Sequence, residues 1–174
     1  MLCLMLSDNL AAITTYAPKE TKSLGAALGS FCYPGLAILL HGALWMGKTL
    51  LTSGIGSALG YDRIKSPSFI IVSEHTGGSI PLAHADLYRL ESQLETDDLD
   101  LESYIDAGYL LVVEWAEHWD SAPREDRWDV TIGLAESEAN EDIREISISA
   151  AGKRASRALR LAISGMISND GSGR

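Results

Sequence analysis

The chain has 174 residues, of which 46% are hydrophobic, so it is long enough to fold as one globular domain with a substantial core. Its formal net charge of −10 at pH 7 argues against broad electrostatic binding to nucleic acid or to an anionic membrane. The two cysteines, Cys3 and Cys32, form no C-x-x-C pair and indicate no disulfide framework.

The opening run from Met1 to Leu6 is apolar, but it is short and lacks a basic leader, so it makes a poor signal peptide. No apolar run approaches the roughly 18 residues of a membrane span. We therefore expect a soluble, cytoplasmic protein with no membrane partner. We expect one domain over residues 1–174, with frayed ends at residues 1–9 and 168–174.

The first predicted elements are a short strand at residues 11–16 and a helix that begins at Pro18, because proline suits the first turn of a helix. The helix should end between Gly29 and Tyr33. Its apolar face has helical spacing and consists of Leu24, Ala27, Leu28 and Phe31. The uninterrupted apolar run from Leu36 to Leu40 then predicts a strand that is buried on both faces.

The next stretch, from Gly42 to Thr49, matches the phosphate-binding loop pattern G-x-x-x-x-G-K-[ST]. A helical apolar pattern follows and ends at Gly60, where a C-terminal cap glycine belongs. A strand, a loop and a helix in this order direct backbone N–H groups at a phosphate. Lys48 would reach the terminal phosphates, and the Thr49 hydroxyl would ligate magnesium. An ordinary turn between a core strand and a helix is the alternative. The expected nucleotide-binding residues of the loop are Gly42, Ala43, Leu44, Trp45, Met46, Gly47, Lys48, Thr49 and Leu50.

The middle of the chain begins with a polar, turn-like segment at residues 63–68, which includes a proline that disfavours a helix. Residues 69–74 and 80–85 are predicted to be two strands around a hairpin signal at 76–79. Residues 91–106 contain seven acidic residues and no basic one, with a few apolar anchors, which indicates an acidic helical surface. Such a surface is either a solvated face or a docking surface for a basic partner.

A second buried strand is predicted at Leu110 to Val113, directly before Glu114. Alternating apolar residues at 128–134 and 146–150 predict two late strands, and the basic residues between 153 and 160 lie on a C-terminal helix. These elements predict an α/β fold of the P-loop NTPase type. It should have three layers, a mixed central sheet with flanking helices.

Two acids stand at the ends of predicted strands, Asp86 after residues 80–85 and Glu114 after the buried run. Ligands of α/β sheets lie beyond the carboxyl ends of strands, so either acid could hold magnesium directly or through water. The alternative is that each caps the next helix. His84 shares a strand face with Asp86, but without a visible third ligand it is better interpreted as a hydrogen-bonded structural histidine than as a zinc ligand. We expect Trp115 to serve in packing.

Four segments, in this order and at this spacing, resemble the TsaE (YjeE) family of bacterial P-loop ATPases. They are the loop at 41–50, Ser66-Pro67-Ser68-Phe69, His84-Ala85-Asp86-Leu87-Tyr88-Arg89 and Val113-Glu114-Trp115, and the resemblance extends from about Thr21 to Ala150. It implies an ATPase that uses ATP and Mg²⁺ and acts with TsaD and TsaB when a threonylcarbamoyl group is attached to an adenosine beside the anticodon of certain tRNAs. ATP hydrolysis, slow without these partners, would reset the complex between turnovers, and tRNA would be met only indirectly through the complex.

Residue by residue, the resemblance implies that Lys48 holds the phosphates and that Thr49 and Glu114 ligate magnesium. Asp86 would support the metal or the attacking water. Lys48, Asp86 and Glu114 would thus form the catalytic set, and Asp86 would join Thr49 and Glu114 at the metal.

The resemblance also implies a switch-like loop over the γ-phosphate at residues 66–69, with Ser68 as a nucleotide contact, and a nucleotide-contacting arginine at Arg144. The family's loop usually reads G-D-L-G-A-G-K-T-T, and Trp45 takes the place of its middle glycine. If that position needs positive φ, a tryptophan there is strained by about 1–2 kcal/mol. Its bulky side chain would block the phosphates if it pointed inward, so we expect it to lie outward. The other departures are Ala43, Met46 and Leu50.

Three other functions compete with this interpretation. A small-molecule kinase would share the loop but should carry an arginine-rich lid, and residues 91–106, where a lid could sit, have no basic residue. A GTPase would carry an N-K-x-D base-reading motif, which the sequence lacks. A nucleotide-dependent assembly module, in which slow hydrolysis is incidental, would share all of the motifs.

Overall fold

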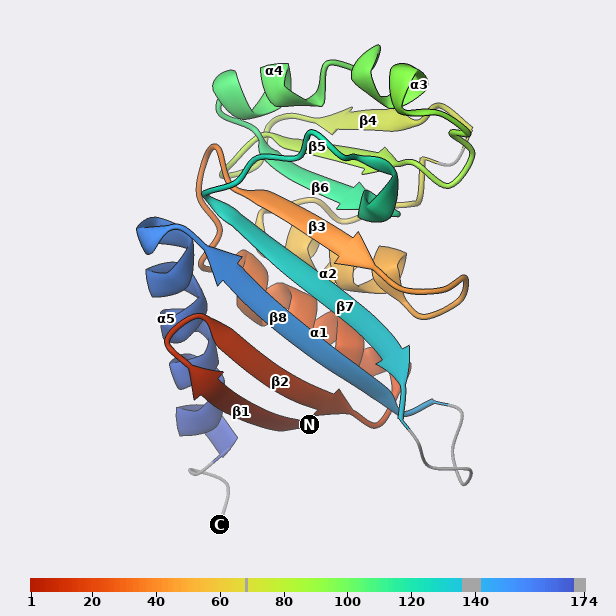
Figure 1. Ribbon diagram of the computed structural model, residues 1–174. Helices are drawn as coiled ribbons and strands as arrows, with labels where there is room; N and C mark the ends of the chain where they lie inside the picture. Colours follow the sequence, from red (N-terminus) through yellow and green to blue (C-terminus); the bar gives the residue numbers. More distant parts are fainter. Residues whose placement is uncertain (68, 136–141, 171–174) are drawn as a thin grey trace.

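The computed structural model describes residues 1–67, 69–135 and 142–170 (Figure 1). Its strands are β1 (Leu2–Ser7), β2 (Leu10–Thr15), β3 (Ala37–His41), β4 (Val72–His75), β5 (Leu82–Asp86), β6 (Leu110–Glu114), β7 (Arg127–Leu134) and β8 (Arg144–Ala151). Its helices are α1 (Pro18–Gly29), α2 (Lys48–Ala58), α3 (Gln93–Asp97), α4 (Leu101–Asp106), the 3-10 helix η1 (Ala116–His118) and α5 (Lys153–Asp170). The strands form one eight-stranded sheet in the order β1-β2-β8-β7-β3-β6-β5-β4.

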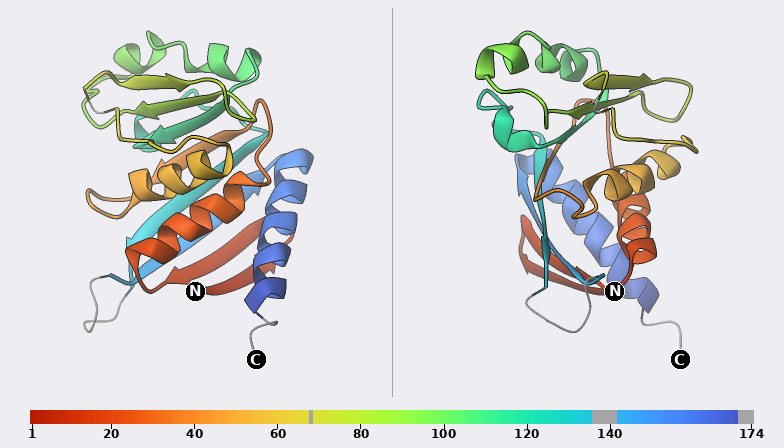
Figure 2. Two further views of the ribbon diagram at one scale, coloured as in Figure 1. Left: turned by 180° about the vertical axis from the view of Figure 1, so that it is seen from behind. Right: turned by 90° about the vertical axis from the view of Figure 1, so that its right-hand side faces the viewer.

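The sheet is mixed and carries helices on both faces, which confirms the predicted three-layer α/β fold. Strands β7, β3, β6 and β5 run parallel, and the other neighbours run antiparallel. Helices α1, α2 and α5 lie on one face, whereas α3, α4 and η1 lie on the opposite side, near β4, β5 and β6 (Figure 2). One apolar core packs under the first helix layer around Trp128, and a second packs under the other layer around Trp119.

The parallel strands bring the predicted acids to one edge of the sheet. All five residues of β5 and of β6 are buried, as are the first four of β3. In register, Glu114 lies opposite Asp86 on one side and opposite Leu40 on the other. Because the carboxyl ends of parallel strands meet at the same edge, the two acids lie beside the loop that follows β3.

The N-terminus differs from expectation, because residues 1–9 are not frayed. Strand β1 pairs with β2 and forms the edge of the sheet. The strand alternates between exposed residues, Leu2, Leu4 and Leu6, and the buried Cys3. Because the exposed residues are apolar too, the sequence does not reveal this alternation. At the other end, α5 continues through Asp170, and residues 171–174 lie outside the described ranges.

The segment before β4 also differs from the predicted strand, which began at residue 69. The backbone N–H groups of Ile70 and Ile71 both donate to the carbonyl of Pro67, and this turn delays the strand to Val72. The acidic stretch 91–106 forms the two short helices α3 and α4, as its composition indicated. Across the described ranges, no helix has both the length and the apolar character that a membrane crossing requires.

Candidate functional site

The predicted strand–loop–helix unit is present, since β3 ends at His41 and α2 begins at Lys48. Both glycines of the pattern have positive φ, +137° at Gly42 and +105° at Gly47, a region that favours glycine. At Gly42 a Cβ atom would also lie 2.3 Å from the backbone oxygen of Ile132. Among the described residues no side chain caps the N-terminus of α2, so its first N–H groups suit an anion such as phosphate.

The Lys48 ammonium folds back onto its own loop. Its Nζ donates to the carbonyl oxygens of Gly42 at 2.5 Å and Ala43 at 2.9 Å. The same atom lies 3.9 Å from the centroid of the Trp115 ring, within the range of a cation–π contact. Desolvation lowers the pKa of Lys48, and the charge of Glu114 opposes this shift. The Lys48 ammonium is thus held by two carbonyl dipoles and by the face of the Trp115 ring. The negatively charged oxygens of a triphosphate would be stronger partners for the same ammonium.

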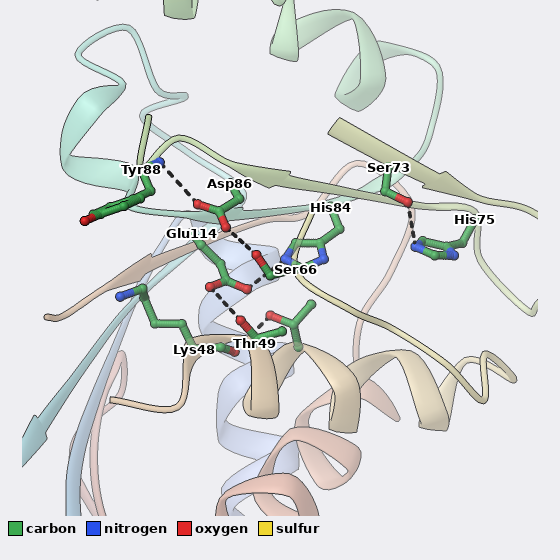
Figure 3. Close-up of polar contacts among 10 residues, drawn as sticks. Lys48, Thr49, Ser66, Ser73, His75, His84, Asp86, Tyr88 and Glu114 are labelled. Atoms are coloured by element: carbon green, nitrogen blue, oxygen red, sulfur yellow. Dashed lines mark hydrogen bonds and ion pairs between the residues drawn. The ribbon is translucent and has the colours of Figure 1, made fainter. Parts of the chain in front are cut away.

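Glu114, at the end of β6, joins the loop to the neighbouring strand (Figure 3). Its Oε2 accepts a hydrogen bond from the Thr49 hydroxyl at 3.0 Å, and its Oε1 lies 2.9 Å from Nε2 of His84. His84 is therefore the hydrogen-bonded histidine that the sequence favoured. Within residues 1–67, 69–135 and 142–170, no three His, Cys, Asp or Glu side chains are arranged to hold a metal ion. The hydroxyl of Thr49 and the carboxylate of Glu114 are nevertheless hard oxygen ligands that fit Mg²⁺ beside a nucleotide.

Asp86 is engaged by two groups of its own. One of its oxygens accepts a hydrogen bond from the Ser66 hydroxyl, and the other accepts one from the backbone N–H of Tyr88 at 3.2 Å (Figure 3). Both acids are almost completely buried. Of the two, Glu114 contacts the Thr49 hydroxyl directly, whereas Asp86 connects the polar segment at residues 63–67 to the site.

Sequence reasoning missed the part that Trp115 and Tyr88 play at the site. The two rings pack with their centroids 4.8 Å apart, and Trp115 also covers the Lys48 ammonium. Trp115 follows Glu114 directly and has a φ of +61°, so the chain turns sharply after β6 and brings the indole over the loop. The adjacency of Glu114 and Trp115 was the only signal in the sequence, and it does not specify this turn.

A cavity of about 410 Å³ opens between the loop and the two acids. Its lining consists of Leu44, Trp45, Met46, Gly47, Lys48, Thr49, Leu50, Ser66, Asp86, Tyr88, Glu114 and Trp115. Of the other predicted contacts, Arg144 donates from Nε to the Met46 carbonyl at 3.0 Å, so it touches the loop from outside the cavity lining. Ser68 lies outside the described residues.

Trp45 adopts the positive φ that the family's glycine would allow, at +68°. Its side chain is 84% exposed, as expected for a group that would otherwise obstruct the phosphates. The neighbouring Leu44 is also exposed. The loop therefore carries a strained backbone and presents two apolar side chains to solvent.

His41 ends β3 directly before the loop and lies between two acids. Its Nδ1 is 3.4 Å from Oε2 of Glu117, and its Nε2 is 3.7 Å from Oδ1 of Asp129. The hydrogen bond to Asp129 raises the pKa of His41, and the charge of Glu117 adds to this, although desolvation opposes it. Asp129 is also paired with Arg127 at 2.9 Å. A protonated His41 thus ties β3, η1 and β7 together beneath the loop.

Comparisons with known proteins give a consistent result. Residues 15–146 match the family described as "Threonylcarbamoyl adenosine biosynthesis protein TsaE". The tRNA threonylcarbamoyladenosine biosynthesis protein TsaE of Bacillus subtilis is 37% identical over 141 residues, covering 80% of this chain and 85% of its own length. The protein of the same name from Streptomyces coelicolor is 35% identical, covering 76% and 92%. The crystal structure of YdiB from Bacillus subtilis matches with a TM-score of 0.73 and 31% identity, covering 88% of this chain and 93% of that one. This chain belongs to the TsaE family.

Proposed function

We propose that this chain is a Mg²⁺-dependent ATPase. The observation that supports this best is the 3.0 Å contact between Thr49 and Glu114 at the cavity that the loop lines. It joins the hydroxyl of a phosphate-binding loop to an acid on the adjacent parallel strand. P-loop NTPases use such a pair to hold the magnesium ion of their nucleotide.

Each polar side chain then has a task. Lys48, whose ammonium now contacts the carbonyl oxygens of its own loop, would hold the β- and γ-phosphates of ATP, and Thr49 and Glu114 would hold the cation. When bound, Mg²⁺ neutralises negative charge on the phosphates. Asp86 keeps Ser66, and with it the polar segment at residues 63–67, at the cavity, where this segment would face the phosphates.

We further propose that the chain acts in the cytoplasm, with TsaD and TsaB, in forming threonylcarbamoyladenosine in tRNA. Membership of the TsaE family and the names of its relatives support this pathway. The net charge of −10 gives the chain little attraction for tRNA phosphates, which favours contact with tRNA only through the partners.

The phosphate contact is tested by Lys48→Ala. Loss of a charged hydrogen-bond donor should weaken ATP binding by about ten- to a hundredfold in calorimetric titrations with Mg²⁺. The matched control is Lys153→Ala, since Lys153 is an exposed lysine at the start of α5. Equal affinities in the two variants, with unchanged thermal stability, would mean that the loop does not bind the phosphates.

A further inference from the structure

The residue of interest is His84, a polar side chain in the middle of a completely buried strand. Along β5, side chains point alternately to the two faces, so Leu82, His84 and Asp86 share the face toward α2. The partner strand β6 places Val112 opposite His84 and Glu114 opposite Asp86. An apolar residue would suit the position of His84 as well as Val112 suits its own, so packing alone does not account for a histidine.

The hydrogen bond of His84 identifies which of its ring nitrogens is the donor. Nε2 lies 2.9 Å from Oε1 of Glu114, whereas Nδ1 has no hydrogen-bond partner within the described parts of the chain. A carboxylate oxygen of an ionised glutamate only accepts hydrogen bonds, so the ring nitrogen that faces it is the donor. Nε2 of His84 therefore carries a proton and donates it to Glu114.

This bond determines how the Glu114 carboxylate is presented. The terminal torsion of a glutamate is soft, so a carboxylate held at one oxygen only has a broad range of orientations. In this chain Oε1 is held by His84, whose ring is enclosed in the core, and Oε2 is directed at the Thr49 hydroxyl. Figure 3 shows the imidazole, the carboxylate and the hydroxyl in one continuous hydrogen-bonded row.

We propose that His84 is a positioning residue that fixes Glu114, so that Oε2 is held ready for the magnesium ion of the nucleotide. This inference rests on the function proposed above. Groups that hydrogen-bond to metal ligands typically change metal affinity by 10- to 100-fold when they are removed, because the ligand loses its orientation. His84 does not contact the nucleotide cavity itself, so its effect passes through Glu114 alone.

Two substitutions separate positioning from packing. His84→Gln keeps an N–H donor near the place of Nε2, and His84→Met fills a similar volume without a donor. His84→Asn, whose amide is too short to reach Glu114, replaces the methionine variant if that one does not fold. His75→Gln is the matched control, because His75 lies on the adjacent strand β4 and bonds to Ser73.

The first readout is calorimetric binding of the non-hydrolysable analogue AMP-PNP at stepped concentrations of free Mg²⁺. In His84→Met the Mg²⁺ concentration for half-maximal effect should rise about tenfold or more, while affinity without Mg²⁺ stays within about twofold. His84→Gln and His75→Gln should stay within about threefold of the unmodified chain. Unchanged Mg²⁺ dependence in His84→Met, or equal damage in the glutamine and methionine variants, would overturn the inference.

The second readout needs no nucleotide. A long-range ¹H–¹⁵N correlation spectrum of the free protein, with the His84 signals assigned by their loss in His84→Gln, should show a proton on Nε2. An Nε2 that carries no proton would overturn the inference, because it could not donate to Glu114. If the unmodified chain binds AMP-PNP without any dependence on Mg²⁺, the proposed function fails and the role of His84 toward the cation fails with it. The spectrum still decides separately whether the bond to Glu114 exists.

Discussion

Trp45 allows a direct measurement of the strain stored in the loop. Its φ of +68° lies in the left-handed region, where the Cβ atom of an L-residue crowds the following carbonyl. The indole is 84% exposed, so its removal costs little buried apolar surface. Replacement by glycine should therefore report the backbone conformation more than the loss of the side chain.

The expected change in the free energy of unfolding of Trp45→Gly is the difference between two opposing contributions. Relief of the left-handed conformation is worth about 1–2 kcal/mol. Glycine offsets about 0.4–1 kcal/mol of this gain, because it raises the conformational entropy of the unfolded chain and so favours unfolding. Trp45→Gly should thus raise the free energy of unfolding by about 0.5–1 kcal/mol, or the midpoint of thermal unfolding by about 1–4 °C for a chain of this length.

Calorimetric unfolding of Trp45→Gly beside Trp45→Ala is the suitable assay. Alanine removes the indole but keeps the Cβ atom, so it should remain close to the unmodified chain. Because the Trp45 side chain is largely exposed, we expect the affinity for ATP to change by less than about threefold. A glycine variant no more stable than the alanine variant would refute the strain argument.

Two further predictions concern the acids and His41. Glu114→Gln should weaken nucleotide binding only when Mg²⁺ is present, because an amide is a poorer ligand for a hard cation, and Asp86→Asn should reduce hydrolysis at least as much as binding. Calorimetry and turnover measurements that find neither effect would make both acids structural. His41 has a raised pKa, so its ion pairs stabilise the fold fully below its unfolded pKa of about 6.5, and this contribution is lost as the pH rises through the folded pKa. Denaturant unfolding should therefore show the stability advantage over His41→Gln shrinking from pH 6 to pH 8, and a constant difference would contradict the pairing with Glu117 and Asp129.

The parts of the site that the sequence predicts are local ones. The loop from Gly42 to Thr49 is a contiguous motif between a buried strand and a helix, and its conformation depends mainly on neighbours in the chain. Glu114 is recognisable because a run of buried apolar residues ends in an acid. The outward position of Trp45 also follows from local reasoning, since an indole on the inner side of the loop would exclude phosphates.

The features of the site that the sequence did not predict depend on contacts between segments that are distant in sequence. The bond between His84 and Glu114 requires the parallel register of β5 and β6, which no local pattern specifies. The contact between Lys48 and Trp115 requires the sharp turn after β6 as well. Strand β1 was not predicted for another reason. Three of its exposed positions are leucines, Leu2, Leu4 and Leu6, so its sequence lacks the polar alternation of a sheet edge.

The proposal to test is that this chain hydrolyses ATP when it acts together with TsaD and TsaB. Steady-state ATP turnover in the presence of Mg²⁺, measured with and without both proteins, tests it most directly, with Lys48→Ala as the inactive control. We expect slow turnover by the chain alone, a rise of about tenfold or more when both partners are added, and no such rise with Lys48→Ala. A rate that the partners leave unchanged, or that persists in Lys48→Ala, would contradict it.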